Sequence, residues 1–145
     1  MRRIPWLLLV GLILVALAGC GGDSNEAEEP ELSEASKAAC TGSPLSEAPK
    51  LPAGFPQVDN ATYTQQQTQG PTEVVEGYYE GGIQEAHDAY MSAFEQAGFT
   101  VLFDEVEEND SEVAWKGKGR SGQVAIRNEC DEEGRVYLKV TNRPA

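Results

Sequence analysis

One amphipathic segment, residues 83–97, constrains the fold more than any other feature of the chain. Its apolar stripe recurs at spacings of three and four, the period of an α-helix with one buried face. The stripe consists of Ile83, His87, Tyr90, Phe94 and Ala97. Gly98 follows where a left-handed C-terminal cap belongs, so the helix is predicted to end there. A single helix of this kind needs a sheet against which to bury its stripe.

Alternating segments on both sides of this helix predict the strands of that sheet. Residues 61–67, expected at an edge, and 72–80 precede the helix and are rich in threonine, tyrosine and valine. Four further segments follow it, at 100–106, 113–115, 124–130 and 136–141, and Cys130 is expected to point inward. Clean alternation with short turns indicates an antiparallel sheet with one buried face. We therefore predict an α+β fold in the order β-β-α-β-β-β-β, a small antiparallel sheet of five to six strands with one helix packed on one face.

The first 20 residues differ in character from the rest of the chain. Arg2 and Arg3 precede an apolar run at 4–17, and small residues then lead to Cys20. A charged start, an apolar centre and a small-residue end form an export signal. A transmembrane helix is the alternative, but the apolar run is shorter than the roughly 20 residues that span a bilayer.

The end of this segment, L-A-G-C at 17–20, resembles the lipobox of bacterial lipoproteins. In that family the signal is cut before the cysteine and the cysteine thiol carries the lipid. The resemblance implies a mature protein that begins at a lipidated Cys20. It also implies attachment to the cell membrane, facing the extracytoplasmic side.

Composition divides the chain into four parts. The signal peptide occupies 1–19. Residues 20–39 begin with the lipidated cysteine, are acidic and lack an apolar period, which predicts a flexible tether. Residues 40–56 contain four prolines, which predicts an extended strap over the domain surface. A single small α+β domain is expected at 57–145. The strap side chains expected to cover an edge of the core are Leu45, Leu51 and Phe55.

The formal net charge of the chain is −13. A strongly acidic protein is repelled by nucleic acid and by anionic lipid headgroups. We therefore expect no nucleic-acid partner, and we expect membrane attachment to come only from the lipid at Cys20. No cofactor is indicated by the sequence.

Two cysteines remain once Cys20 is assigned to lipid. Thiols outside the cytoplasm tend to oxidise, so Cys40 and Cys130 are predicted to form a disulfide. Such a bond closes a loop of about 90 residues, which corresponds to about 4.5 kcal/mol in the chain-entropy account. Two free thiols are the alternative.

A glycine-rich run at 117–122 matches the pattern G-x-G-x-x-G. The phosphate-binding form of this pattern needs a helix directly after it. A predicted strand follows instead, so the run is expected to be a hairpin turn whose basic side chains face solvent or bind a small anion or an acidic partner. The candidate surface residues are Lys116, Lys118 and Arg120 at this turn, together with Tyr78 and Tyr79 on the strand at 72–80.

The remaining polar candidates are a lone histidine and a run of acids. His87 lies on the apolar stripe of the helix, so it is expected to be a partly buried packing residue. The acids crowd one hairpin and are a weak candidate for a calcium site, although the order of an EF-hand loop is missing. These acids are Asp104, Glu107, Glu108 and Asp110.

Together these features predict a non-catalytic, membrane-anchored extracytoplasmic lipoprotein. Such a chain would act as an accessory module that binds a protein or an envelope component. The alternative is a carrier of a small ligand or a cation. An enzyme that uses His87 with a carboxylate is the least favoured possibility, because no catalytic constellation accompanies the histidine.

Overall fold

The structure is a computed structural model that describes residues 33–145. The predicted signal peptide, the lipid site at Cys20 and most of the acidic tether lie outside the described residues. All the described residues belong to one compact unit. Within the described part of the chain, no helix is long and apolar enough to cross a membrane.

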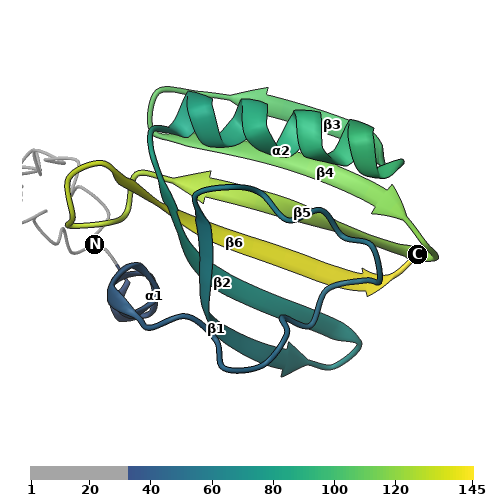
Figure 1. The fold of residues 1–145 in the computed structure, drawn as a ribbon, viewed down its shortest axis with the longest axis horizontal. Helices are drawn as coiled ribbons and strands as arrows, with labels where there is room; N and C mark the ends of the chain where they lie inside the picture. Colours follow the sequence, from purple (N-terminus) through teal and green to yellow (C-terminus); the bar gives the residue numbers. More distant parts are fainter. Residues whose placement is uncertain (1–32) are drawn as a thin grey trace, which may run out of the picture. The chain divides into compact units, whose positions relative to one another are not determined.

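Six strands form one antiparallel sheet in the order β1-β2-β6-β5-β4-β3 (Figure 1). The strands are β1 (Ala61–Gln69), β2 (Thr72–Glu80), β3 (Thr100–Val106), β4 (Asp110–Gly117), β5 (Arg120–Arg127) and β6 (Arg135–Pro144). The helices are α1 (Glu34–Thr41) and α2 (Ile83–Ala97). The predicted antiparallel sheet and α+β class are therefore confirmed. The strand predicted at 124–130 begins and ends earlier than expected, because β5 runs from Arg120 to Arg127 and leaves Cys130 in the loop before β6.

One face of the sheet is covered by α2 and by residues 42–60 (Figure 1). The strap was predicted at 40–56, but Cys40 and Thr41 lie in α1, so from here on the strap means residues 42–60. The predicted stripe of α2 is buried from Ile83 to Phe94. Gly98 ends the helix in the left-handed conformation, with φ 73°, and the backbone N–H of Phe99 donates to the carbonyl of Phe94 at 2.9 Å. The helix therefore begins and ends where its sequence predicts.

Aromatic side chains fill the space between this cover and the sheet. Trp115 is fully buried, and its ring lies 5.3 to 6.0 Å from those of Phe55, Phe94 and Phe99. Phe55 comes from the strap, and Leu45 and Leu51 of the strap also pack against the core. Such close aromatic contacts join the strap, α2 and β4 into one core.

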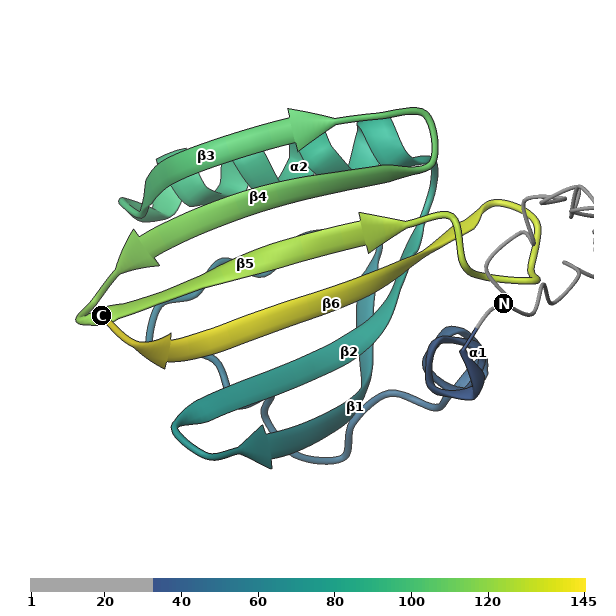
Figure 2. The ribbon, with the colours of Figure 1, turned by 180° about the vertical axis from the view of Figure 1, so that it is seen from behind.

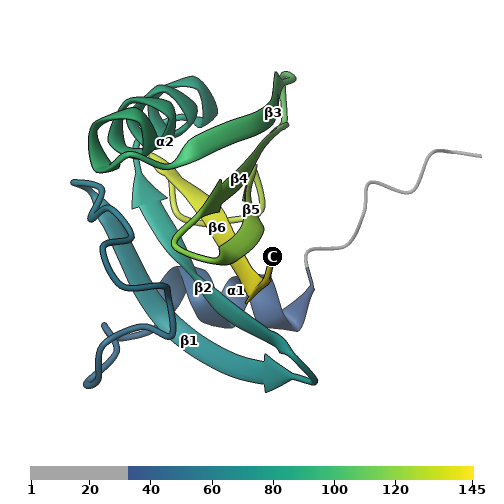
Figure 3. The same ribbon diagram turned by 90° about the vertical axis from the view of Figure 1, so that its right-hand side faces the viewer.

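The opposite face of the sheet carries a second helix, α1, at one end, beside β1, β2 and β6 (Figure 2). Figure 3 shows α1 and the strap on different sides of the sheet. The prediction of a single helix is wrong, and so is that of a flexible tether for its residues 34–39, which lie in α1.

The helix α1 depends on contacts that are distant in sequence. Ser33 caps its first turn by accepting a hydrogen bond from the backbone N–H of Ser36 at 3.1 Å. At its other end, Thr64 donates to the carbonyl of Ala39 at 2.8 Å and Arg135 donates to that of Cys40 at 3.1 Å. Eight residues are too few for a stable isolated helix, so these contacts account for its presence.

Candidate functional site

The predicted basic surface lies on the hairpin that joins β4 to β5. Lys118 and Gly119 form its two-residue turn, and both have positive φ, 52° and 72°, as a type I′ turn requires. The glycine-rich run is therefore a hairpin turn, as predicted. Lys116 and Lys118 are exposed. Arg120 is half-buried, because its Nε donates to Asn142 Oδ1 at 2.8 Å.

The two tyrosines predicted as surface residues do not form one surface with the basic hairpin. Tyr79 is only 6% exposed and belongs to the core, so its assignment to the surface is wrong. Tyr78 points to the opposite face, where the guanidinium carbon of Arg135 lies 4.0 Å from its ring centroid. The partners of Tyr78 and Arg120 on β6 are Tyr137 and Pro144, so about 23 Å of strand separates the two candidates.

His87 lies between α2 and the sheet and is 5% exposed. Its Nδ1 lies 2.8 Å from the hydroxyl of Ser111, and its Nε2 lies 3.5 Å from a carboxylate oxygen of Asp104. A serine, a histidine and a carboxylate thus meet here, a set that the sequence did not reveal because the three come from separate elements. Ser111 is fully buried, so its hydroxyl has no access to a substrate in this conformation. The contacts tie α2 to β3 and β4.

The acidic hairpin does not gather its carboxylates around one point. Asp104 turns toward His87, while Glu107 and Glu108 line a groove of about 710 Å³ at the start of α2. Among the described residues, the one group of three ligand-type side chains with ligand atoms within 4.8 Å of one another is Cys40, Cys130 and Glu132.

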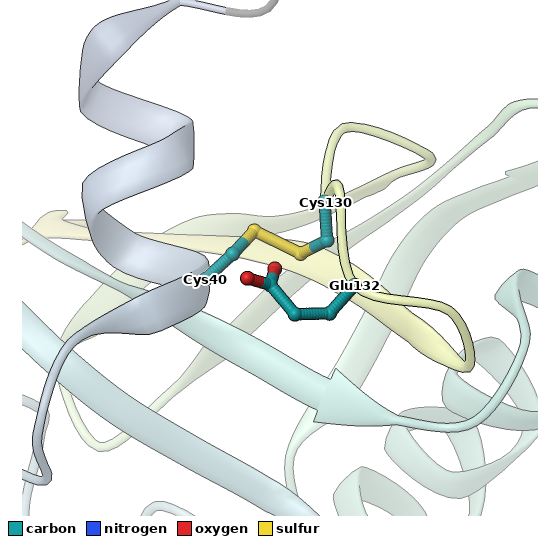
Figure 4. A group of neighbouring side chains, drawn as sticks. All are labelled: Cys40, Cys130 and Glu132. Atoms are coloured by element: carbon teal, nitrogen blue, oxygen red, sulfur yellow. A yellow bond between two sulfur atoms is a disulfide. The ribbon is translucent and has the colours of Figure 1, made fainter.

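The predicted disulfide between Cys40 and Cys130 is present and ties α1 to the loop before β6 (Figure 4). The Cα atoms of the two cysteines are 5.6 Å apart. Because the two sulfurs are bonded to each other, neither is available to a metal ion in this state. The carboxylate of Glu132 lies beside the disulfide, and one of its oxygens is buried without a hydrogen-bond partner. A carboxylate oxygen of Glu132 thus lies within 4.8 Å of both sulfurs.

Next to α1, the sheet carries a buried polar pair that the sequence did not reveal. The hydroxyl of Tyr137 on β6 donates a hydrogen bond to Glu76 on β2, and both residues are almost fully buried. Burial and this hydrogen bond raise the pKa of Tyr137 well above its ordinary value. The alternating pattern of β2 predicts that Glu76 points away from α2. It does not identify the partner of Glu76, because Tyr137 lies 61 residues away in the sequence.

Beyond α1, the same side of β3 to β6 carries no described helix or strap, and we call this side the open face (Figure 2). A hollow of about 240 Å³ lies on it, here called the sheet hollow. Ala125 provides an apolar patch and the surrounding side chains are polar. The residues lining the sheet hollow are Glu112, Gln123, Ala125, Arg127, Lys139 and Thr141.

Strand register places further side chains beside the sheet hollow. Phe103 pairs with Ala114, which pairs in turn with Gln123, so the ring of Phe103 lies on the open face. It is 51% exposed. Lys116 and Arg143 both pair with Ser121, which puts two further cations at the hairpin end of the same face. In the sequence, this site is marked only by the alternate polar side chains of β4, β5 and β6. Any strand face that is exposed to solvent shows the same alternation, so the pattern does not distinguish a binding site.

The geometry thus leaves one side of β3 to β6 uncovered by any described element and holds the histidine between α2 and the sheet. No family model, no curated protein and no solved structure matches this chain.

Proposed function

We propose that the chain is an extracytoplasmic lipoprotein, anchored through Cys20, whose domain binds a component of the cell envelope. The observation that carries this proposal is a disulfide in the domain that follows an L-A-G-C motif. Disulfides persist in oxidising compartments, which an exported chain reaches and a cytosolic chain does not. The motif and the disulfide therefore favour the same location independently.

Binding, and not catalysis, is the activity that the polar side chains favour. The one histidine is engaged by Ser111 and Asp104 between α2 and the sheet. Lys116 and Lys118, by contrast, are exposed on the β4–β5 hairpin next to the open face. Cationic side chains held on a sheet at fixed spacing suit recognition of an anionic surface.

Two measurements test the anchor and the partner separately. Intact-mass analysis of the detergent-extracted protein should find residues 1–19 removed and a lipid on Cys20, and a Cys20→Ala variant should lose the lipid. Retention of Met1 or an unmodified Cys20 thiol would contradict the proposal. Cross-linking in intact cells should then capture an envelope component with the anchored chain, and its absence would rule out the binding role.

The structure also offers a place for the carrier alternative. A hollow of about 510 Å³ lies between the strap and β1, within the size range of small-molecule pockets. Leu51, Phe55 and Val58 give it apolar walls. A carrier would show a rise in melting temperature with an apolar small molecule, and Phe55→Ala would abolish that rise. If a screen of apolar compounds produces no rise, the carrier alternative is rejected.

A further inference from the structure

We propose that the outer edge of β3 binds an extended cationic segment of a partner protein, which adds to the six-stranded sheet as a further strand. This inference rests on the proposed binding role, and it names the chemistry of the partner at a surface separate from the basic hairpin.

The first observation is that the two edges of the sheet differ. The strap covers β1: Leu45 donates its backbone N–H to the carbonyl of Tyr63 at 2.9 Å, and Lys50 donates its backbone N–H to the side chain of Gln66 at 3.0 Å. At the other edge β3 is the last strand, and no described segment pairs with its outer side (Figure 2). An uncovered edge presents backbone donors and acceptors to an added strand.

The side chains of β3 are exposed as well as its backbone. Among the described residues, the exposed large apolar side chains all lie on this strand, at Leu102, Phe103 and Val106. A bulge at Leu102 interrupts the pairing with β4, so the regular part of the edge is residues 103–106. This stretch therefore offers a partner apolar contacts in addition to backbone hydrogen bonds.

The second observation is the charge at this end of the sheet. Residues 81–115, which form α2, β3 and most of β4, contain nine acidic residues and no lysine or arginine. Lys116 lies opposite Thr100, at the start of β3. Arg127 and Arg135 also approach this region, but each is ion-paired with a glutamate, at 3.7 and 3.2 Å. Carboxylates thus outnumber cations around the β3 edge, which favours a cationic partner. The nine acidic residues are Glu85, Asp88, Glu95, Asp104, Glu105, Glu107, Glu108, Asp110 and Glu112.

The third observation is a groove of about 490 Å³ between α2 and the start of β3. Asp88 and Glu95 of α2 bring two exposed carboxylates to it, and neither belongs to an ion pair among the described residues. The other walls are mainly apolar, so the groove matches the apolar stem and charged head of a lysine or arginine. The residues lining the groove are Asp88, Met91, Ser92, Glu95, Phe99 and Val101.

The register of β3 assigns different chemistry to its two faces. Asp104 lies opposite Val113 on the covered face, the side of α2 and the groove, whereas Phe103 lies opposite Ala114 on the open face. Side chains of an added strand alternate in the same way. Those on the side of α2 would meet carboxylates, and those on the open face would meet the ring of Phe103. The partner segment is therefore one in which cationic and apolar residues alternate.

A basic strand from another protein fits this edge better than two occupants that the chain itself could supply. If residues 103–106 of two copies paired antiparallel, Asp104 of one copy would lie opposite Glu105 of the other, and like charges directly opposite destabilise a sheet. Residues 21–32 contain five acidic residues and no lysine or arginine, so the edge repels them too. The carboxylates that keep β3 from pairing with itself therefore admit a strand of opposite charge.

Titration calorimetry with the full chain in mild detergent at physiological salt tests the inference. The probe is a short peptide that alternates lysine and valine and is blocked at both ends. One comparison peptide has the same composition with all its lysines before all its valines, and another has glutamate in place of lysine. We expect the alternating lysine peptide to bind, the block-ordered peptide to bind about tenfold more weakly, and the glutamate peptide to give no heat.

Hydrogen exchange provides a readout that a purely electrostatic contact would not change. At a saturating concentration of the alternating lysine peptide, the outward-facing backbone amides of residues 103–106 should exchange about tenfold more slowly, because they donate to the added strand. The amides of β1, at the opposite edge, should exchange at an unchanged rate.

Two variants and a matched control locate the contact. The double variant Asp88→Asn/Glu95→Gln should weaken binding of the alternating lysine peptide about fivefold, and Phe103→Ala should weaken it about threefold. The control is Glu47→Gln/Glu133→Gln, which also removes two exposed carboxylates, one from the strap and one from the loop before β6. This control should bind as the unaltered chain does.

Three results would overturn the inference: no heat with the alternating lysine peptide, equal affinity for the block-ordered peptide, or unchanged exchange at residues 103–106. A dimer that forms without peptide and already protects these amides would overturn it as well, because a second copy would then occupy the edge. If the inference fails while cross-linking in cells still captures an envelope component, the proposed function stands. If the anchored chain captures nothing and yet binds the peptide at β3, the proposed function fails and the strand-binding edge stands.

Discussion

The two faces of the sheet differ in what covers them and in the side chains that they present. On the covered face, Trp115 packs against three phenylalanines from the strap, α2 and the segment between α2 and β3. On the open face, short and polar side chains such as Ala125, Gln123 and Thr141 surround a shallow hollow. The difference indicates that the covered face provides most of the stability. The open face is correspondingly free to change without unfolding the domain.

The largest effect is expected from the centre of the covered face. Trp115→Ala should lower the free energy of unfolding by about 3–5 kcal/mol, because a fully buried indole leaves both a cavity and lost aromatic contacts. Urea unfolding of the oxidised protein measures this cost. A cost below about 1 kcal/mol would contradict the claim that this face dominates stability.

High pH should also lower the free energy of unfolding, through two buried tyrosines of the covered face. The loss from each tyrosine should be somewhat smaller than the loss in Trp115→Ala. The hydroxyls of Tyr63 and Tyr90 lie 2.9 Å apart, and burial raises the pKa of Tyr63 to about 12 and that of Tyr90 well above its ordinary value. The unfolded chain ionises near pH 10 while the folded one does not. The free energy of unfolding should therefore hold up to about pH 10, and Tyr63 alone should lower it by about 2–3 kcal/mol toward pH 12. Tyr90 and Tyr137, whose pKa values are also raised, should add to this loss.

Urea unfolding at a series of pH values measures the slope of the free energy of unfolding against pH. Tyr63→Phe, which removes one of the two hydroxyls, should make this slope less steep above pH 10. A slope that is unchanged in this variant would assign the alkaline loss to other groups.

At the end of the sheet next to α1, the stability of the domain should depend on one hydrogen-bond donor, the hydroxyl of Tyr137. Tyr137→Phe leaves the buried carboxyl of Glu76 without its hydroxyl partner, which should cost about 1–3 kcal/mol. Replacing both partners, as Tyr137→Phe with Glu76→Leu, should recover part of that cost because no buried polar group is then left unpaired. Thermal unfolding of these two variants and of the single variant Glu76→Leu tests the pair, and additive losses would show that the two side chains act independently.

Glu132, at the same end of the sheet, should slow the chemical reduction of the nearby disulfide. Attack on the disulfide by an added dithiol releases a thiolate beside this carboxylate, and like charges so close disfavour it. Glu132→Gln should therefore speed reduction of the Cys40–Cys130 bond about threefold to tenfold, as measured by trapping free thiols over time. Glu133→Gln is the matched control, since the neighbouring Glu133 is exposed and lies outside the cluster. Equal rates in the two variants would remove Glu132 from this role.

The smallest effects on stability are expected on the open face. Phe103→Ala and Lys139→Gln should each change the free energy of unfolding by less than about 0.5 kcal/mol, because neither side chain is buried in the core. Urea unfolding under the conditions used for Trp115→Ala makes the two faces directly comparable. A loss of about 2 kcal/mol in either variant would show that the open face is structural.

Local patterns made much of this fold predictable. The helix at 83–97 is marked by its period and by Gly98, and the hairpin at 117–122 is marked by its glycines. The disulfide followed from counting cysteines. Each of these signals lies within a short stretch of sequence, or needs only one pairing, so no knowledge of tertiary packing was required.

The elements that escaped prediction depend on distant partners. The helix α1 requires contacts with Thr64, Arg135 and Cys130, none of which is near it in sequence. The pattern of β2 separates Tyr78 from Tyr79, but only the packing of α2 and the strap decides which of the two is buried. The sheet hollow likewise arises from three neighbouring strands, so no single segment carries its signature.

The position of β6 has a consequence for how the chain folds. It is the last strand in sequence and lies at the centre of the sheet, between β2 and β5. Until residues 135–144 are available, the pair β1–β2 and the group β3–β4–β5 have no strand to join them. Folding of the sheet must therefore wait for residues 135–144, and its rate should be limited by these long-range pairings. Deleting the last strand would not trim an edge but would divide the sheet in two, whereas a sheet built in chain order would lose only its final strand.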